Sequence, residues 1–313
     1  MKLIAIIPAY NEESTIAQVI KEIPRQILGI DQVEVLVIND GSNDQTASIA
    51  SEAGADFVIN HQKNIGLAQT FNQGIQAALE KGADIIINTD ADNHYNQSRI
   101  PELVAPILKG EADIVVANRD LKNLKPMPLV NRLGNYLGSF FVTRLCGLPR
   151  DLDVSSGFRA YSREAALRMN VVSTHTYAHE TLIQAADHNL IIKSIVIPAR
   201  PVARKSRLIK NVPSHISKSL VVILKTFTVY KPLRVMLFFG GILLLFGFLG
   251  VARFLYFYFT SGGSGHIQSL VLSGVLIILG FQVSIMGLIS QAIGWNRRIL
   301  EDILTWQKRE RYK

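Results

Sequence analysis

Short apolar runs alternate with amphipathic stretches over the first two thirds of the chain. The apolar runs are "LIAII", "VEVLVI", "DFVIN", "DIIIN", "DIVVAN" and "IIKSIVI". Between them, apolar residues at helical spacing predict helices over Ser14–Ile27, Gln45–Ala53, Leu67–Lys81 and Pro101–Leu108. Because this alternation is typical of βαβ units, the pattern predicts an α/β domain with a mostly parallel sheet from Leu3 to about Pro198.

Beyond residue 210 the pattern changes to long apolar stretches. Val235–Ala252 and Ile267–Trp295 contain no Asp, Glu, Lys or Arg. At about 1.5 Å per helical residue, each is long enough to cross a hydrocarbon core about 30 Å thick. The pattern therefore predicts an α/β domain at 1–210, an amphipathic juxtamembrane segment at 211–232, two transmembrane helices within 233–296 (about 233–259 and 267–295) and a basic tail at 297–313.

Basic residues give this 313-residue chain a net charge of +8, which would suit nucleic acid, anionic lipid or an anionic substrate. They cluster on both sides of the predicted helix pair, whereas the "TSGGSGH" link has none. By the positive-inside rule, we expect a cell membrane protein with two spans whose α/β domain and both termini are cytoplasmic. Because the basic residues lie beside membrane spans and do not alternate with aromatics on a soluble face, no nucleic-acid partner is expected.

Three glycines recur at seven-residue spacing in the second apolar stretch, at Gly280, Gly287 and Gly294. They share one helix face, and small residues on such a face let another helix approach closely. The spacing therefore predicts a homo-oligomer that forms through the transmembrane helices.

Polar segments follow the predicted strands where a ligand site is expected. "PAYNEE" (Pro8–Glu13) follows the first strand, "NDGSNDQT" (Asn39–Thr46) the second and "TDAD" (Thr89–Asp92) the fourth. In open α/β sheets, the loops at the carboxyl ends of the strands form the ligand crevice, so these segments should converge. The sequence lacks the glycine-rich signatures of a dinucleotide site or a P-loop.

Two roles are open for the acidic residues of these segments. Asp40 could accept hydrogen bonds from a nucleotide base or ribose, or it could cap the next helix, as its neighbours at 42–44 equally could. Asp90 and Asp92 could hold a hard divalent cation or merely turn the chain. A bent backbone would suit metal binding, whereas in a straight strand both carboxylates would lie on the same face.

Six segments, in order, carry a specific resemblance: "IPAYNEE", "VLVINDGSNDQT", "NIGLAQTFNQGI", "INTDADNHY", "VANRD" and "SGFRAYSREAAL". Over roughly residues 3–210 the chain resembles family 2 glycosyltransferases of the GT-A fold. Within that family it is similar to enzymes that move a sugar from a nucleotide diphosphate to a polyprenyl phosphate, such as dolichyl-phosphate mannose synthases. The resemblance implies a Rossmann-like GT-A catalytic domain, here followed by a two-helix transmembrane hairpin.

The resemblance also implies roles for particular residues. It places four residues in the nucleotide pocket: Pro8, Tyr10, Glu12 and Asp40. It makes Asp90 and Asp92 a DXD element that holds Mg²⁺ or Mn²⁺, and the cation neutralises charge on the departing nucleoside diphosphate. His94, just beyond this element, departs from the usual pattern of relatives, which leaves a catalytic role for it open.

Further residues are assigned to the acceptor and to the diphosphate. Arg119 matches the family's strand-end arginine and, with Arg132, should face the acceptor phosphate, although a surface salt bridge would equally explain Arg132. Glu180 lies where relatives present an acid that orients the acceptor or acts as a base. The segment "PARPVARKSRL" lacks the usual glycine at position 204, so either arginine could meet the diphosphate. It offers three candidate contacts: Arg200, Arg204 and Ser206.

We therefore predict an inverting, metal-dependent hexosyltransferase. Its substrates would be a UDP- or GDP-sugar and dolichyl or undecaprenyl phosphate, and its product a polyprenyl-monophosphate sugar. Two alternatives stay open. One is transfer to a different lipid or polysaccharide acceptor, and the other is a non-catalytic membrane scaffold that binds a nucleotide sugar. Retention of both DXD carboxylates argues against the scaffold.

Overall fold

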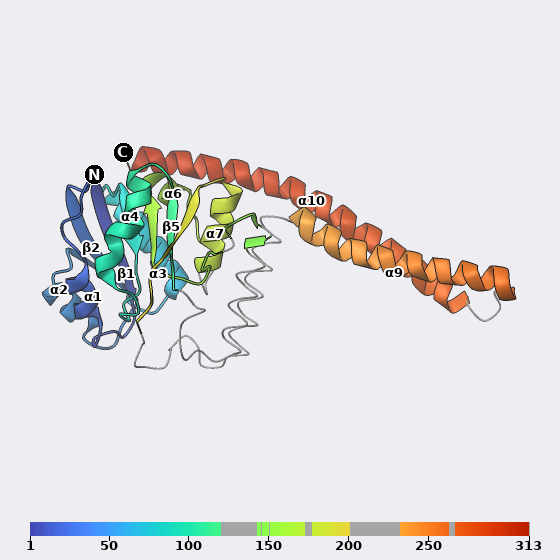
Figure 1. Cartoon of the computed structure of the whole chain (residues 1–313), viewed down its shortest axis with the longest axis horizontal. Helices are drawn as coiled ribbons and strands as arrows, with labels where there is room; N and C mark the ends of the chain where they lie inside the picture. The colour runs from blue at the N-terminus through green and yellow to red at the C-terminus, as the bar shows by residue number, and fades with distance from the viewer. Residues whose placement is uncertain are drawn as a thin grey trace. The chain divides into compact units, whose positions relative to one another are not determined.

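The computed structural model describes residues 1–119, 143–144, 146–149, 151–172, 177–200, 232–262 and 267–312. Figure 1 shows its elements, which are β1 (Lys2–Ala9), α1 (Ile16–Glu22), β2 (Gln32–Asn39), α2 (Thr46–Glu52), β3 (Phe57–Asn60), α3 (Leu67–Glu80), β4 (Ile85–Asn88), the 3-10 helix η1 (Gln97–Arg99), α4 (Ile100–Leu108), β5 (Ile114–Asn118), β6 (Arg159–Ser162), α6 (Arg163–Arg168), α7 (Ala178–Asp187), β7 (Ile192–Val196), α9 (Pro232–Ser261) and α10 (Ile267–Arg311).

Within the described residues, the strands form a seven-stranded sheet in the order β3-β2-β1-β4-β6-β5-β7. Neighbouring strands are parallel except at β6, which runs antiparallel between β4 and β5. Side chains of β1 are buried on both faces of the sheet: Leu3 and Ile7 join the core formed with α1 and α4, whereas Ile6 lies close to Gly74 of α3. Burial on both faces explains why the parallel strands read as continuous apolar runs.

All six apolar runs of the sequence lie in strands of this sheet, and the four helical patterns correspond to α1–α4. The predicted α/β fold with a mostly parallel sheet is therefore confirmed. The antiparallel β6 was not predicted, because "RAYS" is short and begins with a charged residue. Its register sets Arg159 opposite Asn88, which brings the residues just before β6 to the carboxyl end of β4.

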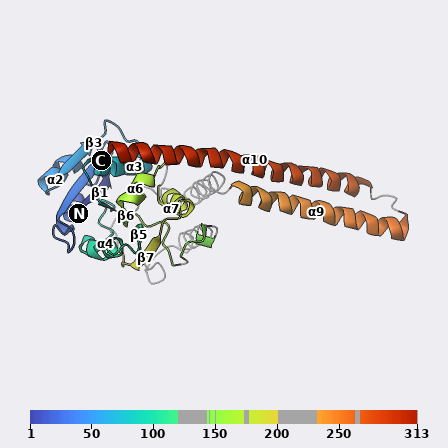
Figure 2. The same cartoon turned by 90° about the horizontal axis from the view of Figure 1, so that it is seen from above.

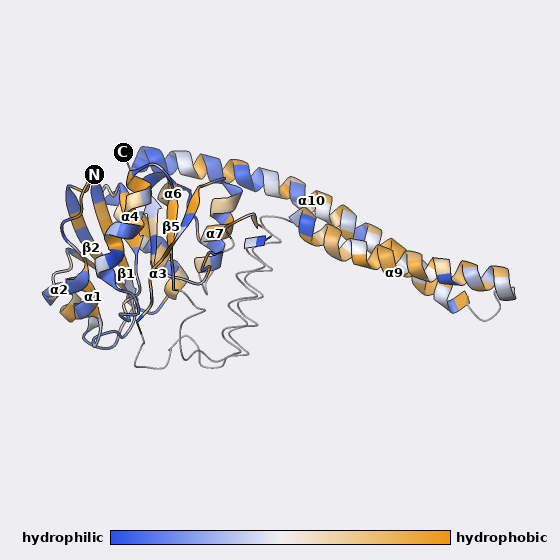
Figure 3. Cartoon of the chain, viewed as in Figure 1, coloured by the Kyte–Doolittle hydropathy of each residue, from blue (hydrophilic) through white to orange (hydrophobic). Residues whose placement is uncertain are grey.

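Two helices, α9 and α10, are long and apolar enough to cross a membrane. Figure 3 shows mostly apolar residues along α9 and along the part of α10 that runs beside it, whereas the C-terminal part of α10 is largely hydrophilic. Large side chains such as Phe246 and Phe281 are about 60% exposed, whereas a core helix of a soluble protein would bury them. These helices are candidate membrane spans.

Small residues let α9 and α10 pack closely along their length, and Figure 2 shows the two helices side by side. A Cβ at Gly280 would lie 2.8 Å from Leu244 Cγ and 2.9 Å from Gly240 O, and one at Gly287 would lie 2.7 Å from Met236 Cβ. Gly294 has open space around it. Two of the three glycines that suggested an oligomer therefore face α9 of the same chain, and the homo-oligomer stays a prediction.

The predicted basic tail from residue 297 is not a separate segment, because α10 continues to Arg311. Its last turns belong to the same compact unit as the sheet. Lys308 Nζ donates to Met169 O (3.0 Å) at the end of α6, and Arg309 donates to both carboxylate oxygens of Glu164 (2.6 Å each). A cation suits a helix C-terminus, where backbone carbonyls lack partners.

Replacing Gly280 by alanine should destabilise the helix pair, because the new methyl group meets backbone and side-chain atoms of α9. We expect the free energy of unfolding to fall by about 1–3 kcal/mol, as in other overpacked interfaces. Thermal unfolding of the full-length protein in detergent measures this. Gly274→Ala is the matched control on α10, since no atom lies within 4 Å of its added Cβ. Equal melting temperatures for the two variants would contradict the packing described.

Candidate active site

The loops after β1 and β2 are joined by hydrogen bonds into one wall. Asn11, which has a φ of 55°, donates its backbone N–H to Ser42 Oγ (2.9 Å), and its Oδ1 accepts from Asn43 N (2.9 Å). Glu12 N donates to Thr46 Oγ1 (2.8 Å). The predicted convergence of these two segments is therefore present. Among the predicted nucleotide residues on this wall, Tyr10 is exposed and Glu12 is buried, and Pro8 lies near the end of β1.

Asp40 is buried at the end of β2, and its carboxylate holds the loop that precedes α3. It accepts hydrogen bonds from Ile65 N (2.9 Å) and Gly66 N (3.0 Å), and it lies 2.8 Å from His61 Nδ1. Asp40 does not cap α2, because the N-cap position is Gln45, and it is Asp44 Oδ1 that accepts from Thr46 N (3.0 Å) at the start of that helix. Asp40 therefore orders the loop beside the candidate nucleotide pocket.

Asp90 and Asp92 lie in a sharp bend directly after β4. Asp92 Oδ1 accepts a hydrogen bond from His94 N (3.1 Å), and Asn93 between them has a φ of 58°. Asparagine tolerates this left-handed backbone conformation better than most residues. The bend gives the two carboxylates the non-strand geometry that the metal hypothesis requires.

A glycine, Gly157, lies against the Asp90 carboxylate. A Cβ at Gly157 would lie 2.7 Å from both carboxylate oxygens of Asp90. Gly157 is fixed on both sides: its N–H donates to Tyr95 Oη (3.1 Å), and its carbonyl accepts from Asn88 Nδ2 (2.6 Å). Glycine at this position leaves room for the carboxylate.

The environment of Asp90 disfavours its charge. Burial and the neighbouring Asp92 raise the pKa of Asp90 to about 7, although Arg119 and Arg159 act in the opposite direction. Burial also raises the pKa of Tyr95 to about 12, which keeps this hydroxyl protonated. A cation close to Asp90 would favour the ionised form of this carboxyl and so lower its pKa.

Arg119 follows β5 and is held in one orientation by acidic and polar neighbours. Its Nε donates to Asp153 Oδ2 (2.7 Å), and its Nη2 donates to Asp153 Oδ1 (3.1 Å) and to Ser155 Oγ. Burial opposes the charge of Asp153, but Arg119 lowers its pKa below the ordinary value. The predicted acceptor-phosphate arginine is therefore also the partner of a buried carboxylate.

Arg159 is fully buried and braces the same region. It donates to Ser156 O (2.8 Å), Val154 O (2.9 Å), Ala178 O (2.9 Å) and Thr181 Oγ1 (2.8 Å). These acceptors are neutral and do not compensate the guanidinium charge. This positive charge lowers the pKa of Asp90. The bonds tie the segment before β6 to the start of α7.

The other predicted residues are bound to different partners or lie outside the described residues. Glu180, in the first turn of α7, is buried, and its Oε1 accepts from Val172 N (3.0 Å). Arg200 contacts Glu22 and Asn93. Three predicted residues lie outside the described residues: Arg132, Arg204 and Ser206.

The residues at the strand ends fit a hard divalent cation that takes some of its ligands from the protein and others from a substrate. Oxygen ligands from carboxylates are those that Mg²⁺ and Mn²⁺ prefer. No three His, Cys, Asp or Glu side chains are grouped as a metal cage in the part of the chain that the structure describes. A cation at Asp90 and Asp92 would therefore complete its coordination with oxygens of the substrate or of water.

The sequence did not predict three residues that shape this site: Asp153, Gly157 and Arg159. "SGFRAYSREAAL" carried the family resemblance, but nothing in its spacing shows that its glycine lies under Asp90. An acid two residues before a serine pair gives no signal of its own. The antiparallel insertion of β6 brings these residues to the site.

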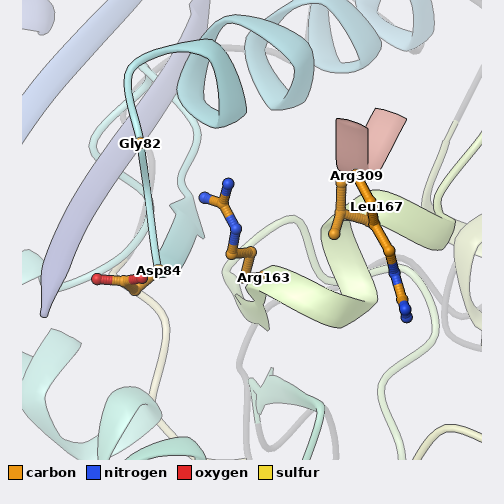
Figure 4. Close-up of a pocket in the computed structure, with 5 residues that line it drawn as sticks. All are labelled: Gly82, Asp84, Arg163, Leu167 and Arg309. Carbon is orange, nitrogen blue, oxygen red and sulfur yellow. The ribbon is translucent and has the colours of Figure 1, made fainter. Parts of the chain in front are cut away.

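A separate pocket lies at the other end of β4 and contains none of the predicted residues. Figure 4 shows its lining, which consists of Gly82, Asp84, Arg163, Leu167 and Arg309. Both arginines already have partners: Arg163 donates to Ala83 O (2.8 Å), and Arg309 pairs with Glu164. Because Asp84 precedes β4 and Asp90 follows it, this pocket is distinct from the carboxylate site.

Comparison with known proteins identifies relatives of the chain. The family model "Glycosyl transferase family 2" matches residues 4–168. The UDP-N-acetylglucosamine–dolichyl-phosphate N-acetylglucosaminyltransferase of Methanococcus voltae is 32% identical over 178 residues, which cover 51% of this chain and 69% of that protein. The undecaprenyl-phosphate 4-deoxy-4-formamido-L-arabinose transferase of Edwardsiella ictaluri is 26% identical over 316 residues, which cover 95% of this chain and 89% of that protein.

A solved structure shares the fold. It is glucosyl-3-phosphoglycerate synthase from Mycobacterium tuberculosis, in complex with Mn²⁺, UDP-glucose and phosphoglyceric acid. It is 23% identical and superposes with a TM-score of 0.56 over 71% of this chain and 79% of that chain. The α/β domain therefore has the GT-A fold.

Asp90→Asn should stabilise the ligand-free protein, because it removes a carboxylate whose charge the fold disfavours. The pKa in the folded protein is raised, so the wild type loses stability as the pH rises from about 4 through about 7. We expect a gain of about 4 kcal/mol for the variant at pH 8, at about 1.4 kcal/mol for each pKa unit between the ordinary value and about 7. The gain should shrink as the pH falls and disappear below about pH 3, where Asp90 is protonated in both the folded and the unfolded state. Unfolding measured from pH 4.5 to pH 8 tests this, and a gain that does not depend on pH would contradict it.

Proposed function

Because the chain belongs to glycosyl transferase family 2, we propose that it transfers a hexose from a UDP- or GDP-sugar to the phosphate of a polyprenyl lipid, dolichyl or undecaprenyl phosphate. The observation that carries the proposal is the carboxylate pair in the bend after β4, where Asp90 lies against Gly157 and Asp92 accepts from His94 N. The relatives named for dolichyl-phosphate and undecaprenyl-phosphate transfer support the acceptor class.

In the proposed reaction, an oxygen of the lipid phosphate forms a bond to C1 of the sugar. The bond between C1 and the diphosphate oxygen breaks, and its electron pair leaves with the nucleoside diphosphate. Attack from the opposite face inverts the configuration at C1. A phosphate monoester has its second pKa near 6, so the acceptor is already an anionic nucleophile at neutral pH and needs no general base.

The protein's part in this reaction is positioning and charge compensation. Asp90 and Asp92 would hold Mg²⁺ or Mn²⁺, which when bound neutralises charge on the leaving diphosphate. The Mn²⁺ in the similar solved structure supports a divalent cation. Arg119 would supply positive charge beside the acceptor phosphate. Glu180 is engaged with Val172 N, which suits a structural role better than that of a base.

The candidate spans suit a lipid acceptor. We propose that α9 and α10 cross the cell membrane and that the catalytic domain and both termini are cytoplasmic. The support is the distribution of basic residues, which flank the helix pair and are absent from the link at 262–266. The lipid phosphate would then reach the site from the inner leaflet.

Membranes that contain the wild-type protein should form a lipid-linked sugar from a labelled nucleotide sugar and a defined polyprenyl phosphate. Asp92→Asn should lower this turnover about 100-fold or more, because it removes one anionic metal ligand. Thin-layer separation of the labelled lipid measures the product, and mass spectrometry over a panel of donors identifies the sugar and the base. Undiminished turnover by the variant would refute the metal site.

The same assay separates the alternatives. Label that appears in a lipid without a phosphate, or in a polysaccharide, would favour a different acceptor. Binding of a nucleotide sugar without transfer to any acceptor would favour the membrane scaffold.

Gly157→Ala should weaken cation binding about tenfold, because the added methyl group displaces the Asp90 carboxylate. Electron paramagnetic resonance during titration with Mn²⁺ measures the affinity, with the nucleoside diphosphate identified in the donor panel present. The loss should not add to that of Asp90→Asn in the double variant, since both act on one carboxylate. Additive losses would show that the methyl group acts elsewhere.

A further inference from the structure

Arg200 joins three parts of the catalytic domain next to the carboxylate pair. Its Nη1 donates to both carboxylate oxygens of Glu22, at 3.0 and 2.7 Å, and to Asn93 Oδ1 at 2.8 Å. Its backbone N–H donates to His94 O at 2.8 Å. One residue thus contacts the last turn of α1 and holds the two residues after Asp92 by a side-chain and a main-chain bond.

The backbone that carries Arg200 is itself anchored. Ile197, just after β7, donates its N–H to Asn118 O (2.9 Å) at the end of β5. Glu22 is held as well, since its Oε1 accepts from Gln18 Nε2 one helical turn earlier (3.0 Å). Arg200 therefore connects the bend after β4 both to helix α1, through Glu22, and to the sheet, through the backbone that follows β7.

The bend needs such support. Asn93 has a positive φ, and the internal bond from His94 N to Asp92 Oδ1 holds the turn from one side only. Arg200 supplies two further bonds from the other side. Loss of these bonds would let the turn at 92–94 relax and would move the Asp92 carboxylate away from Asp90.

We infer that Arg200 is a positioning residue for the carboxylate pair, acting through Asn93 and His94, and that it is not the arginine that binds the diphosphate. The inference rests on the proposed function for its catalytic consequence. Its charge is already compensated by Glu22 at 2.7 Å. A diphosphate ligand would have to compete with the Glu22 carboxylate, both of whose oxygens accept from Arg200 Nη1, whereas a positioning role uses the contacts as they stand.

The two roles make opposite predictions for Glu22. The contacts of Arg200 with Glu22, Asn93 and His94 form a clamp on the bend. If Arg200 acts through the bend, Glu22→Gln should mimic Arg200→Gln, because both weaken this clamp. If Arg200 binds the diphosphate, Glu22→Gln should leave activity unchanged or improve it, because it frees the arginine for its ligand. Glu111→Gln is the matched control, since it removes the carboxylate partner of an exposed cation in β7. In the wild type, Glu111 Oε2 lies 2.6 Å from Lys193 Nζ.

Hydrogen exchange of the full-length, ligand-free protein in detergent gives a readout that needs no substrate. We expect Arg200→Gln and Glu22→Gln each to speed exchange of peptides that span residues 90–96 about tenfold, whereas Glu111→Gln should not. Both clamp variants should also lower kcat about tenfold with little change in KM for the donor. The double variant should be no worse than the weaker single one, because the residues act as a unit.

Unchanged exchange at residues 90–96 in both variants would overturn the inference. So would a raised donor KM in Arg200→Gln alone, with wild-type behaviour of Glu22→Gln. If Arg200→Gln does not fold, Asn93→Ala removes one of the same bonds and serves in its place. Faster exchange in the two clamp variants, with no transfer of any sugar by the wild-type protein, would support the clamp and refute the proposed function. Transfer by the wild-type protein, with unchanged exchange in both variants, would support the proposed function and overturn the clamp.

Discussion

The disfavoured negative charge of Asp90, which is buried and lies near Asp92, is the constraint on which the site is built. Burial disfavours the charge of Asp90, the negative charge of Asp92 adds to this effect, and together they bring the pKa of Asp90 to about 7. The fold tolerates this because positive charge lies close by in Arg119 and Arg159. A divalent cation bound beside Asp90, as proposed, would offset this disfavoured negative charge.

The surroundings of the pair are held by bonds that do not involve it. The loops after β1 and β2 bond to each other, Asp40 fixes the loop before α3, and Gly157 is held by Tyr95 and Asn88. Groups that are already fixed need little rearrangement when charge develops in a reaction. A rigid frame around two mutually repelling acids is the arrangement expected of a preorganised site.

Apolar periodicity was enough to predict the parallel strands of the sheet, because burial on both faces leaves a continuous apolar signal. It also predicted α1–α4 and the α9–α10 pair, but not the antiparallel β6. The position of the carboxylates followed from the rule that ligand loops lie at the carboxyl ends of strands. Gly157 and Asp153 could not be predicted, since their roles depend on where the antiparallel β6 inserts. Two of the three predicted glycines of α10, Gly280 and Gly287, do lie against another helix, but spacing cannot tell a helix of the same chain from one of another copy.

Arg119 shows how one residue can serve both the frame and the chemistry. Two of its nitrogens are bound to Asp153 and Ser155, which fixes the plane of the guanidinium. Because Asp153 is buried and its pKa is lowered by this contact, the pair stays charged at neutral pH. The same guanidinium favours ionisation of Asp90. An acceptor phosphate would therefore meet a cation whose direction is already set, so that its charge can be used without the entropy loss of ordering a long side chain.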